Sequence, residues 1–153
     1  KISSLVARLR VDFPEVKLEE SDDFYWSPST KTVCYDPGAP SSGQATLLHE
    51  IAHALLDHRH FKRDIDLLKI EREAWDYART VLAPLYDVMI DEERVEDMVD
   101  TYREWLHARS KCPHCSLTGI QTEGSSYHCL GCNQNWKVND ARRCGLKRYA
   151  LKT

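Results

Sequence analysis

Four cysteines near the C-terminus constrain the fold of this 153-residue chain more than any other feature. They form two Cys-x2-Cys pairs, Cys112/Cys115 and Cys129/Cys132, with 13 residues between the pairs. Each pair can fold back in a tight turn, so that four thiolates surround one tetrahedral ion. The spacing therefore predicts a closed structural zinc site rather than a disulfide framework. Because metal-binding thiols need a reducing compartment, we expect the protein in the cytoplasm.

The segment that carries these cysteines resembles a zinc ribbon, with strand-like residues at 127–128 and 136–138. It is short enough that we expect its folding to depend on the metal. Residues 111–153 carry 7 Lys/Arg against 2 Asp/Glu, whereas residues 1–110 carry 14 against 22. Basic side chains of the tail could contact DNA phosphates or dock on the acidic part of the chain, and a solvated surface is the alternative. These side chains are Arg142, Arg143, Lys147 and Arg148.

The remaining sequence predicts an α+β fold with two domains. Apolar spacing favours helices over 2–11, 44–57, 65–82 and 91–109, and strands over 16–19, 24–26 and 32–35. Residues 1–110 would form a helical domain with a small antiparallel sheet, and residues 111–153 the ribbon. The longest apolar runs are too short to cross a membrane, so we expect no membrane association.

The sequence His49-Glu50-Ile51-Ala52-His53 is an HExxH motif inside the helix expected over 44–57. Residues four apart lie one above the other on a helix, so both imidazoles can reach one ion with Glu50 beside it. With one further protein ligand, zinc keeps a fourth position for water, which Glu50 can deprotonate as general base. A chance match is the alternative, but burying these groups beside apolar neighbours without a metal would be costly.

Two glutamates, Glu71 and Glu73, compete as the third ligand on the next helix. Glu71 lies within an apolar stripe that consists of Leu67, Leu68, Ala74, Trp75, Ala78, Val81 and Leu82. Glu73 lies about 200° around the helix from Glu71, on a polar side. Helical phase therefore favours Glu71 as the ligand, whereas a cap or a pairing with an arginine is the alternative reading of that residue.

The segments Thr46–His58 and Glu71–Pro84 resemble the ImmA/IrrE family of metallopeptidases, which reads HExGHxLLxH and then ExxANxFAxxLLxP. The resemblance covers about residues 1–90 and implies a zincin-like helical core with Glu71 as third ligand. It also implies a regulatory endopeptidase of bacteria, phages or mobile elements. Such enzymes act in transcription regulation and stress responses, often by cleaving a helix-turn-helix repressor. Trp75 stands where the family has Asn or Asp, a residue that supports a ligand histidine in related enzymes.

Three further side chains are expected near the substrate. His58 and His60 follow His53 by five and seven residues, near the helix end, where each could donate to an oxyanion or stabilise the helix C-terminus as a cation. Tyr35 could also act on an oxyanion, with a core or surface role as the alternative. In proteases of this architecture an edge strand holds the substrate, and residues 32–35 are expected to form it.

We therefore expect a zinc metalloendopeptidase with two zinc ions, one catalytic and one structural, whose ribbon recruits a protein partner or DNA. One alternative is a non-enzymatic DNA- or protein-binding regulator, to which Trp75 and the basic ribbon point. The other is a SprT/Spartan-like protease that acts at DNA. Its third ligand is a later histidine, and His58 and His60 follow the motif too closely for a separate helix to supply one.

Overall fold

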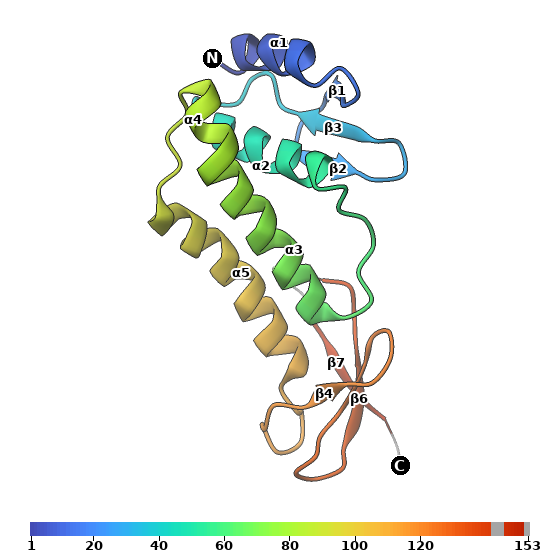
Figure 1. Cartoon of the computed structure of the whole chain (residues 1–153). Helices are drawn as coiled ribbons and strands as arrows, with labels where there is room; N and C mark the ends of the chain where they lie inside the picture. The colour runs from blue at the N-terminus through green and yellow to red at the C-terminus, as the bar shows by residue number, and fades with distance from the viewer. Residues whose placement is uncertain (142–145, 152–153) are drawn as a thin grey trace. The chain divides into compact units, whose positions relative to one another are not determined.

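The computed structural model describes residues 1–141 and 146–151, which form an α+β fold (Figure 1). The chain divides into two compact units, the first comprising residues 1–60 and 70–95 and the second residues 61–69 and 96–153. Helices α3 (Asp64–Tyr77) and α5 (Glu92–Ser110) each contribute residues to both units. Over the described ranges, none of the helices combines the length and the apolar character needed to cross a bilayer.

A three-stranded sheet organises the first unit. Strands β1 (Lys17–Glu20), β2 (Tyr25–Ser27) and β3 (Thr32–Tyr35) lie in the order β1-β3-β2. β3 pairs in parallel with β1 and antiparallel with β2 through the expected hairpin. The sheet is therefore mixed, and the expectation of an antiparallel sheet is wrong, because β1 and β3 run in the same direction. The expectation that residues 32–35 form an edge strand is wrong. They form the central, fully buried strand, because β3 lies between β1 and β2 and pairs with both.

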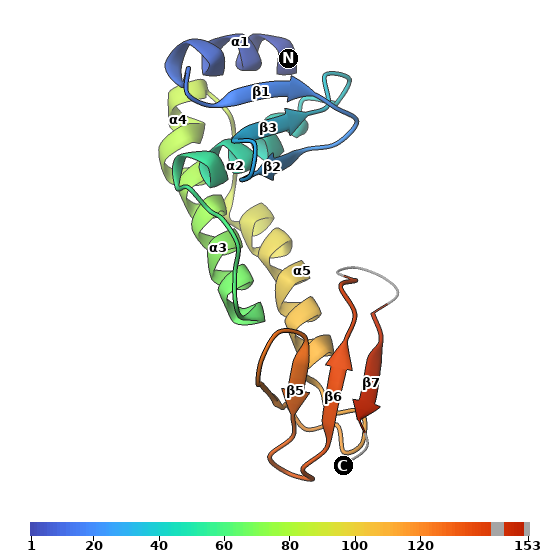
Figure 2. The ribbon, with the colours of Figure 1, turned by 90° about the vertical axis from the view of Figure 1, so that its right-hand side faces the viewer.

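Two helices cover this sheet. α1 (Ile2–Asp12) buries Ile2, Leu5, Val6 and Leu9, which recur at helical spacing, and ends before Pro14. α2 (Gly43–Leu55) packs against α1, β2, β3 and the segment 78–82 (Figure 2). Its apolar residues from Ala45 to Ala52 and both of its histidines are buried. The local packing of α2 therefore holds the HExxH motif inside the first unit.

Beyond α3 the chain stays helical for longer than the sequence suggests. A π-helical turn, η1 (Ala78–Leu82), leads into α4 (Ala83–Tyr86). Pro84 does not stop the helix, because it lies in the first turn of α4, where its missing N–H breaks no helical hydrogen bond. The wider π turn also changes the helical phase. Val81, expected on the buried stripe, is 39% exposed, whereas Leu82 is buried.

The second unit contains an antiparallel sheet with strand order β4-β5-β6-β7. These strands are β4 (Ile120–Gln121), β5 (Ser126–His128), β6 (Asn135–Val138) and β7 (Arg148–Leu151). Tyr127 and Trp136 stack at its centre, with ring centroids 5.6 Å apart, beside Cys112 and Cys129. The unit also includes residues 61–69 and 96–110, and the predicted domain boundary after residue 110 stays a prediction.

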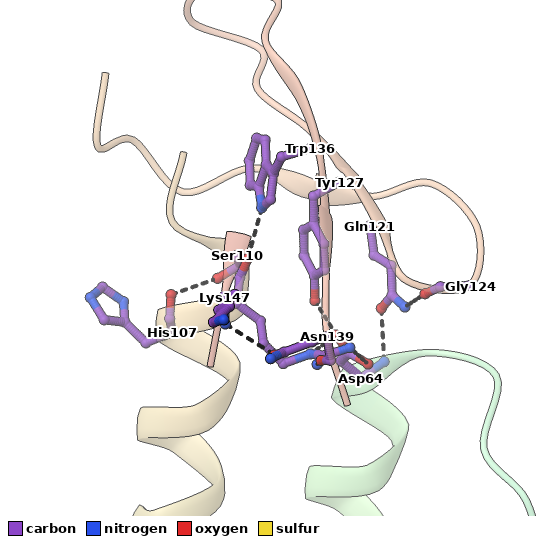
Figure 3. A network of polar contacts seen from close by, with 10 residues as sticks. Asp64, His107, Ser110, Gln121, Gly124, Tyr127, Trp136, Asn139 and Lys147 are labelled. Atoms are coloured by element: carbon purple, nitrogen blue, oxygen red, sulfur yellow. Dashed lines mark hydrogen bonds and ion pairs between the residues drawn. The ribbon is translucent and has the colours of Figure 1, made fainter. Parts of the chain in front are cut away.

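A buried polar network joins the helical and sheet parts of the second unit (Figure 3). Arg109 Nε donates to Asp64 Oδ2 at 2.8 Å, and the Tyr127 hydroxyl donates to the same oxygen. The backbone N–H of Asp64 donates to Gln121 Oε1, and Trp136 Nε1 donates to the backbone oxygen of Arg109. Buried polar groups need such partners, so the network fixes how these segments meet.

Replacement of Trp136 by alanine tests this core. The side chain is fully buried, so Trp136→Ala should lower the free energy of unfolding of the second unit by about 3–5 kcal/mol. The measurement is urea unfolding followed through the amide signals of β5 and β6. Tyr149→Ala, at a residue 51% exposed on β7, is the control and should change the value by about 0.5 kcal/mol or less. Equal effects of the two substitutions would contradict the described core.

Candidate metal centres

The first cluster begins with the two histidines of α2. His49 and His53 are four residues apart, so their rings lie on one side of the helix. Their Nε2 atoms are 3.1 Å apart, and both side chains are buried. The helix alone therefore aims two imidazole nitrogens at one point, as the HExxH spacing predicts.

Glu71 of α3 completes this cluster. Its Oε2 lies 3.0 Å from His49 Nε2 and its Oε1 lies 3.3 Å from His53 Nε2. Glu71 is buried, whereas the Glu73 side chain is 60% exposed, so the helical-phase argument picked the inward-facing residue. One ligand atom from each of His49, His53 and Glu71 lies within 4.8 Å of the others, and this group could bind a metal ion.

The chemistry of these donors fits a cation. Tetrahedral zinc with nitrogen and oxygen ligands at about 2.0–2.2 Å separates neighbouring ligand atoms by about 3.3–3.6 Å. The separations of 3.0 to 3.3 Å in the cluster lie at or slightly below the lower end of that range. Within the described chain, Glu71 Oε2 is buried without an aligned hydrogen bond. A bound cation would satisfy this oxygen and both nitrogen lone pairs at once.

Glu50 lies at the edge of the same cluster. Its Oε1 is 3.8 Å from His49 Nε2, and its side chain is 13% exposed. Burial raises the pKa of Glu50 to about 8, although His53 and the backbone N–H of Trp26 act in the opposite direction. Burial also acts to raise the pKa of Glu71, but its contacts with His49 and His53 outweigh that effect and lower the pKa. The environments of the two carboxyl groups thus push their pKa values apart, a pattern found where one binds charge and the other transfers protons.

The other residues expected near the substrate lie in different settings. His58 follows the end of α2 and lies at the opposite nitrogen of His53, with 2.9 Å between the two Nδ1 atoms. His60 is exposed and lies outside the helices, and Tyr35 is buried in the central strand β3. That any of the three contacts an oxyanion or substrate stays a prediction.

Two tryptophans contact the histidines of this site, and the sequence pointed to only one of them. Trp75 stacks on His49, with ring centroids 4.1 Å apart and 16° between the planes. Across the described residues, His49 Nδ1 and Trp75 Nε1 are both buried without a hydrogen-bond partner. Trp26 of β2 donates from its Nε1 to the backbone oxygen of His58 at 2.7 Å. The identity of Trp75 signalled a changed environment for His49, whereas nothing local in the sequence pointed to Trp26.

The second cluster consists of the four cysteines of the second unit. Cys112 Sγ lies 3.6 Å from Cys132 Sγ, and Cys115 Sγ lies 3.4 Å from Cys129 Sγ. Disulfide sulfurs are about 2.05 Å apart, so these are free thiols. Four sulfurs at about 2.3 Å from one tetrahedral zinc would be about 3.8 Å apart. The cluster therefore matches the predicted closed site and could bind a metal ion.

Each cysteine pair forms a tight backbone turn. Ser116 and Asn133, the residues after each second cysteine, adopt left-handed conformations with φ of 67° and 61°. Their backbone N–H groups donate to the oxygens of Cys112 and Cys129. Burial acts to raise the pKa of Cys112, but backbone N–H groups of residues 114 and 115 outweigh it and lower the pKa to about 6. Such N–H donors favour the thiolate that a metal requires.

The basic residues predicted to contact DNA are described only in part. Lys147 lies just before β7, which begins at Arg148, and Arg148 Nη1 donates to the backbone oxygen of Lys111. Arg142 and Arg143 lie outside the described residues. A DNA contact by any of the four stays a prediction.

Comparison of the chain with family models, with curated proteins and with solved structures finds no match. Function is therefore inferred from the geometry of the two clusters.

Metal content is the direct test of both clusters. We expect two divalent ions per chain by native mass spectrometry, because the donor sets are separate. Glu71→Ala should remove one ion and Cys129→Ser the other, whereas His60→Ala, at an exposed residue, should retain both. Two ions retained in Glu71→Ala would contradict the first cluster, and two retained in Cys129→Ser would contradict the second.

Proposed function

We propose that this chain is a zinc-dependent endopeptidase of the ImmA/IrrE type, with a zincin-like core in its first unit. The observation that carries the proposal is the convergence of His49, His53 and Glu71 with Glu50 beside them. Two imidazoles, one carboxylate and an adjacent acid–base carboxylate form the donor set of a catalytic zinc site rather than a closed structural one. The four-cysteine cluster is then the structural zinc site, and thiolate ligation favours a reducing cytoplasm.

The residues divide the chemistry between them. His49 and His53 hold the ion through Nε2, and Glu71 contributes a carboxylate oxygen. When bound, zinc acts as a Lewis acid and lowers the pKa of a water molecule towards about 7. The charge of the bound ion would lower the pKa that burial raises, so that Glu50 is ionised and accepts a proton from the attacking water, which it later passes to the nitrogen of the leaving amine. Because Glu50 is nearly enclosed, its proton transfers occur in a site from which most solvent is excluded.

A protein substrate, such as a helix-turn-helix repressor, fits the regulatory role that the family resemblance implies. An extended segment would add to an outer strand, since backbone pairing recognises such substrates. β2 is the better placed of the two outer strands, because it contacts α2 and because the backbone N–H of Trp26 reaches Glu50. The basic ribbon would recruit the partner or its DNA.

Trp75 favours a second candidate, a metal-binding regulator that does not cleave. Its indole covers His49 where related enzymes have a polar residue, so the ion would serve as a sensor or a structural element. A SprT/Spartan-like protease has less support, because Glu71 takes the place of a third histidine ligand.

Glu50→Gln separates the two candidates. The variant should retain the same zinc content as the unchanged chain and lose peptide cleavage by at least about 10²-fold, because glutamine cannot accept the proton. The measurement is a count of new protein N-termini by mass spectrometry in cells that express each form. Glu15→Gln, at an exposed residue of the same unit, is the matched control and should cleave like the unchanged chain.

Equal cleavage by Glu50→Gln and Glu15→Gln would contradict the assigned base. No cleavage by the unchanged, zinc-loaded chain would favour the non-catalytic regulator.

A further inference from the structure

His58 is placed by the way in which α2 ends. Asp57 adopts a left-handed conformation, with φ of 52°. The N–H of Asp57 donates to the oxygen of Ala54, and the N–H of His58 donates to the oxygen of His53. This pair of bonds is the Schellman motif, which brings the second residue beyond the cap back over the last turn. The local backbone therefore sets the His58 side chain beside His53.

Two further contacts hold His58 in this position. Trp26 Nε1 donates to its backbone oxygen, which anchors the residue to β2. On the far side of the ring, His58 Nε2 lies 3.5 Å from Glu73 Oε1. His58 thus bridges the ligand His53 and a carboxylate of α3.

The ligand role of His53 determines which ring nitrogens of His53 and His58 carry hydrogen. To bind a cation through Nε2, a neutral His53 must carry its hydrogen on Nδ1. That hydrogen then needs an acceptor, and His58 Nδ1 lies 2.9 Å away. If His58 accepts there, its own hydrogen lies on Nε2 and faces the Glu73 carboxylate. Only this order of neutral tautomers satisfies both contacts and leaves a lone pair for the metal.

The other ligand histidine lacks such support. Within the described chain, His49 Nδ1 has no hydrogen-bond partner, and the face of its ring is covered by Trp75. Histidine ligands are ordinarily oriented by a partner at the nitrogen away from the metal. In this site that function rests on the His53 side alone.

We propose that His58, backed by Glu73, is a positioning residue that fixes the metal-binding tautomer and the ring orientation of His53. The inference depends on the proposed metal site of His49, His53 and Glu71, and it adds residues that touch neither the ion nor the substrate. It gives His58 a role through His53, at the nitrogen opposite the cluster, rather than at an oxyanion.

The test is the affinity for zinc, measured by competition with a chelator on protein whose cysteine cluster is already loaded. His58→Leu and His58→Asn are nearly equal in shape, but only asparagine retains an acceptor close to the position of Nδ1. His58→Leu should bind the second zinc about 10- to 100-fold more weakly, the usual effect of losing such a partner. His58→Asn should remain within about threefold of the unchanged chain. His60→Leu is the control for an exposed histidine and should have no effect.

The possible results distinguish a failure of the proposed function from a failure of this inference alone. If the unchanged chain binds only the zinc of the cysteine cluster, both the proposed function and this inference fail. If it binds two ions and His58→Leu holds the second as tightly as the unchanged chain, only the inference fails. Equal losses in His58→Leu and His58→Asn would also overturn it, because the acceptor would then not be the cause.

A second measurement needs no variant. Long-range ¹H–¹⁵N NMR spectra of the zinc-loaded chain report which nitrogen of each histidine carries hydrogen. We expect hydrogen on Nδ1 of His53 and on Nε2 of His58. Hydrogen on Nδ1 of His58 would overturn the proposal, since that atom could not then accept from His53.

Discussion

The first unit depends on one electrostatic constraint: a buried carboxylate and two buried imidazoles are aimed at a single point. Without a cation, Glu71 would keep a buried oxygen that lacks an aligned hydrogen bond. A divalent ion would remove that cost, provided that α2 and α3 place their ligand atoms around the same point. α2 packs against the sheet and against η1, and this packing fixes the position of its two histidines.

The second unit also brings possible metal ligands close together, and these ligands are cysteine sulfurs. Its core is small, and two of its cysteines are fully buried beside Trp136 and Tyr127. In each pair, backbone N–H groups lie at the sulfur of the first cysteine and lower the pKa of Cys112 and of Cys129, which favours the thiolate there. The first group offers three possible ligands with Glu50 beside them, whereas the second offers four cysteines.

Residue spacing predicted the parts of the site that depend on the geometry of a single helix. The spacing of His49 and His53 and the phase of Glu71 follow from one regular helix each, and both were predicted correctly. The edge strand was not, because the pairing of β1 with β3 is a contact between distant segments. The left-handed conformation of Asp57, which a glycine would have signalled, ended α2 early and turned His58 back onto His53. The π turn that exposed Val81 likewise has no signature in the residues themselves.

Anomalous diffraction at the zinc absorption edge, on crystals of the zinc-loaded chain, would show whether His49, His53 and Glu71 share one ion. The account predicts a peak bonded to Nε2 of His49, Nε2 of His53 and a Glu71 oxygen, each at about 2.0–2.2 Å, besides the peak of the cysteine cluster. A map with density for all three side chains but no peak between them, or with a peak that Glu71 does not touch, would contradict it.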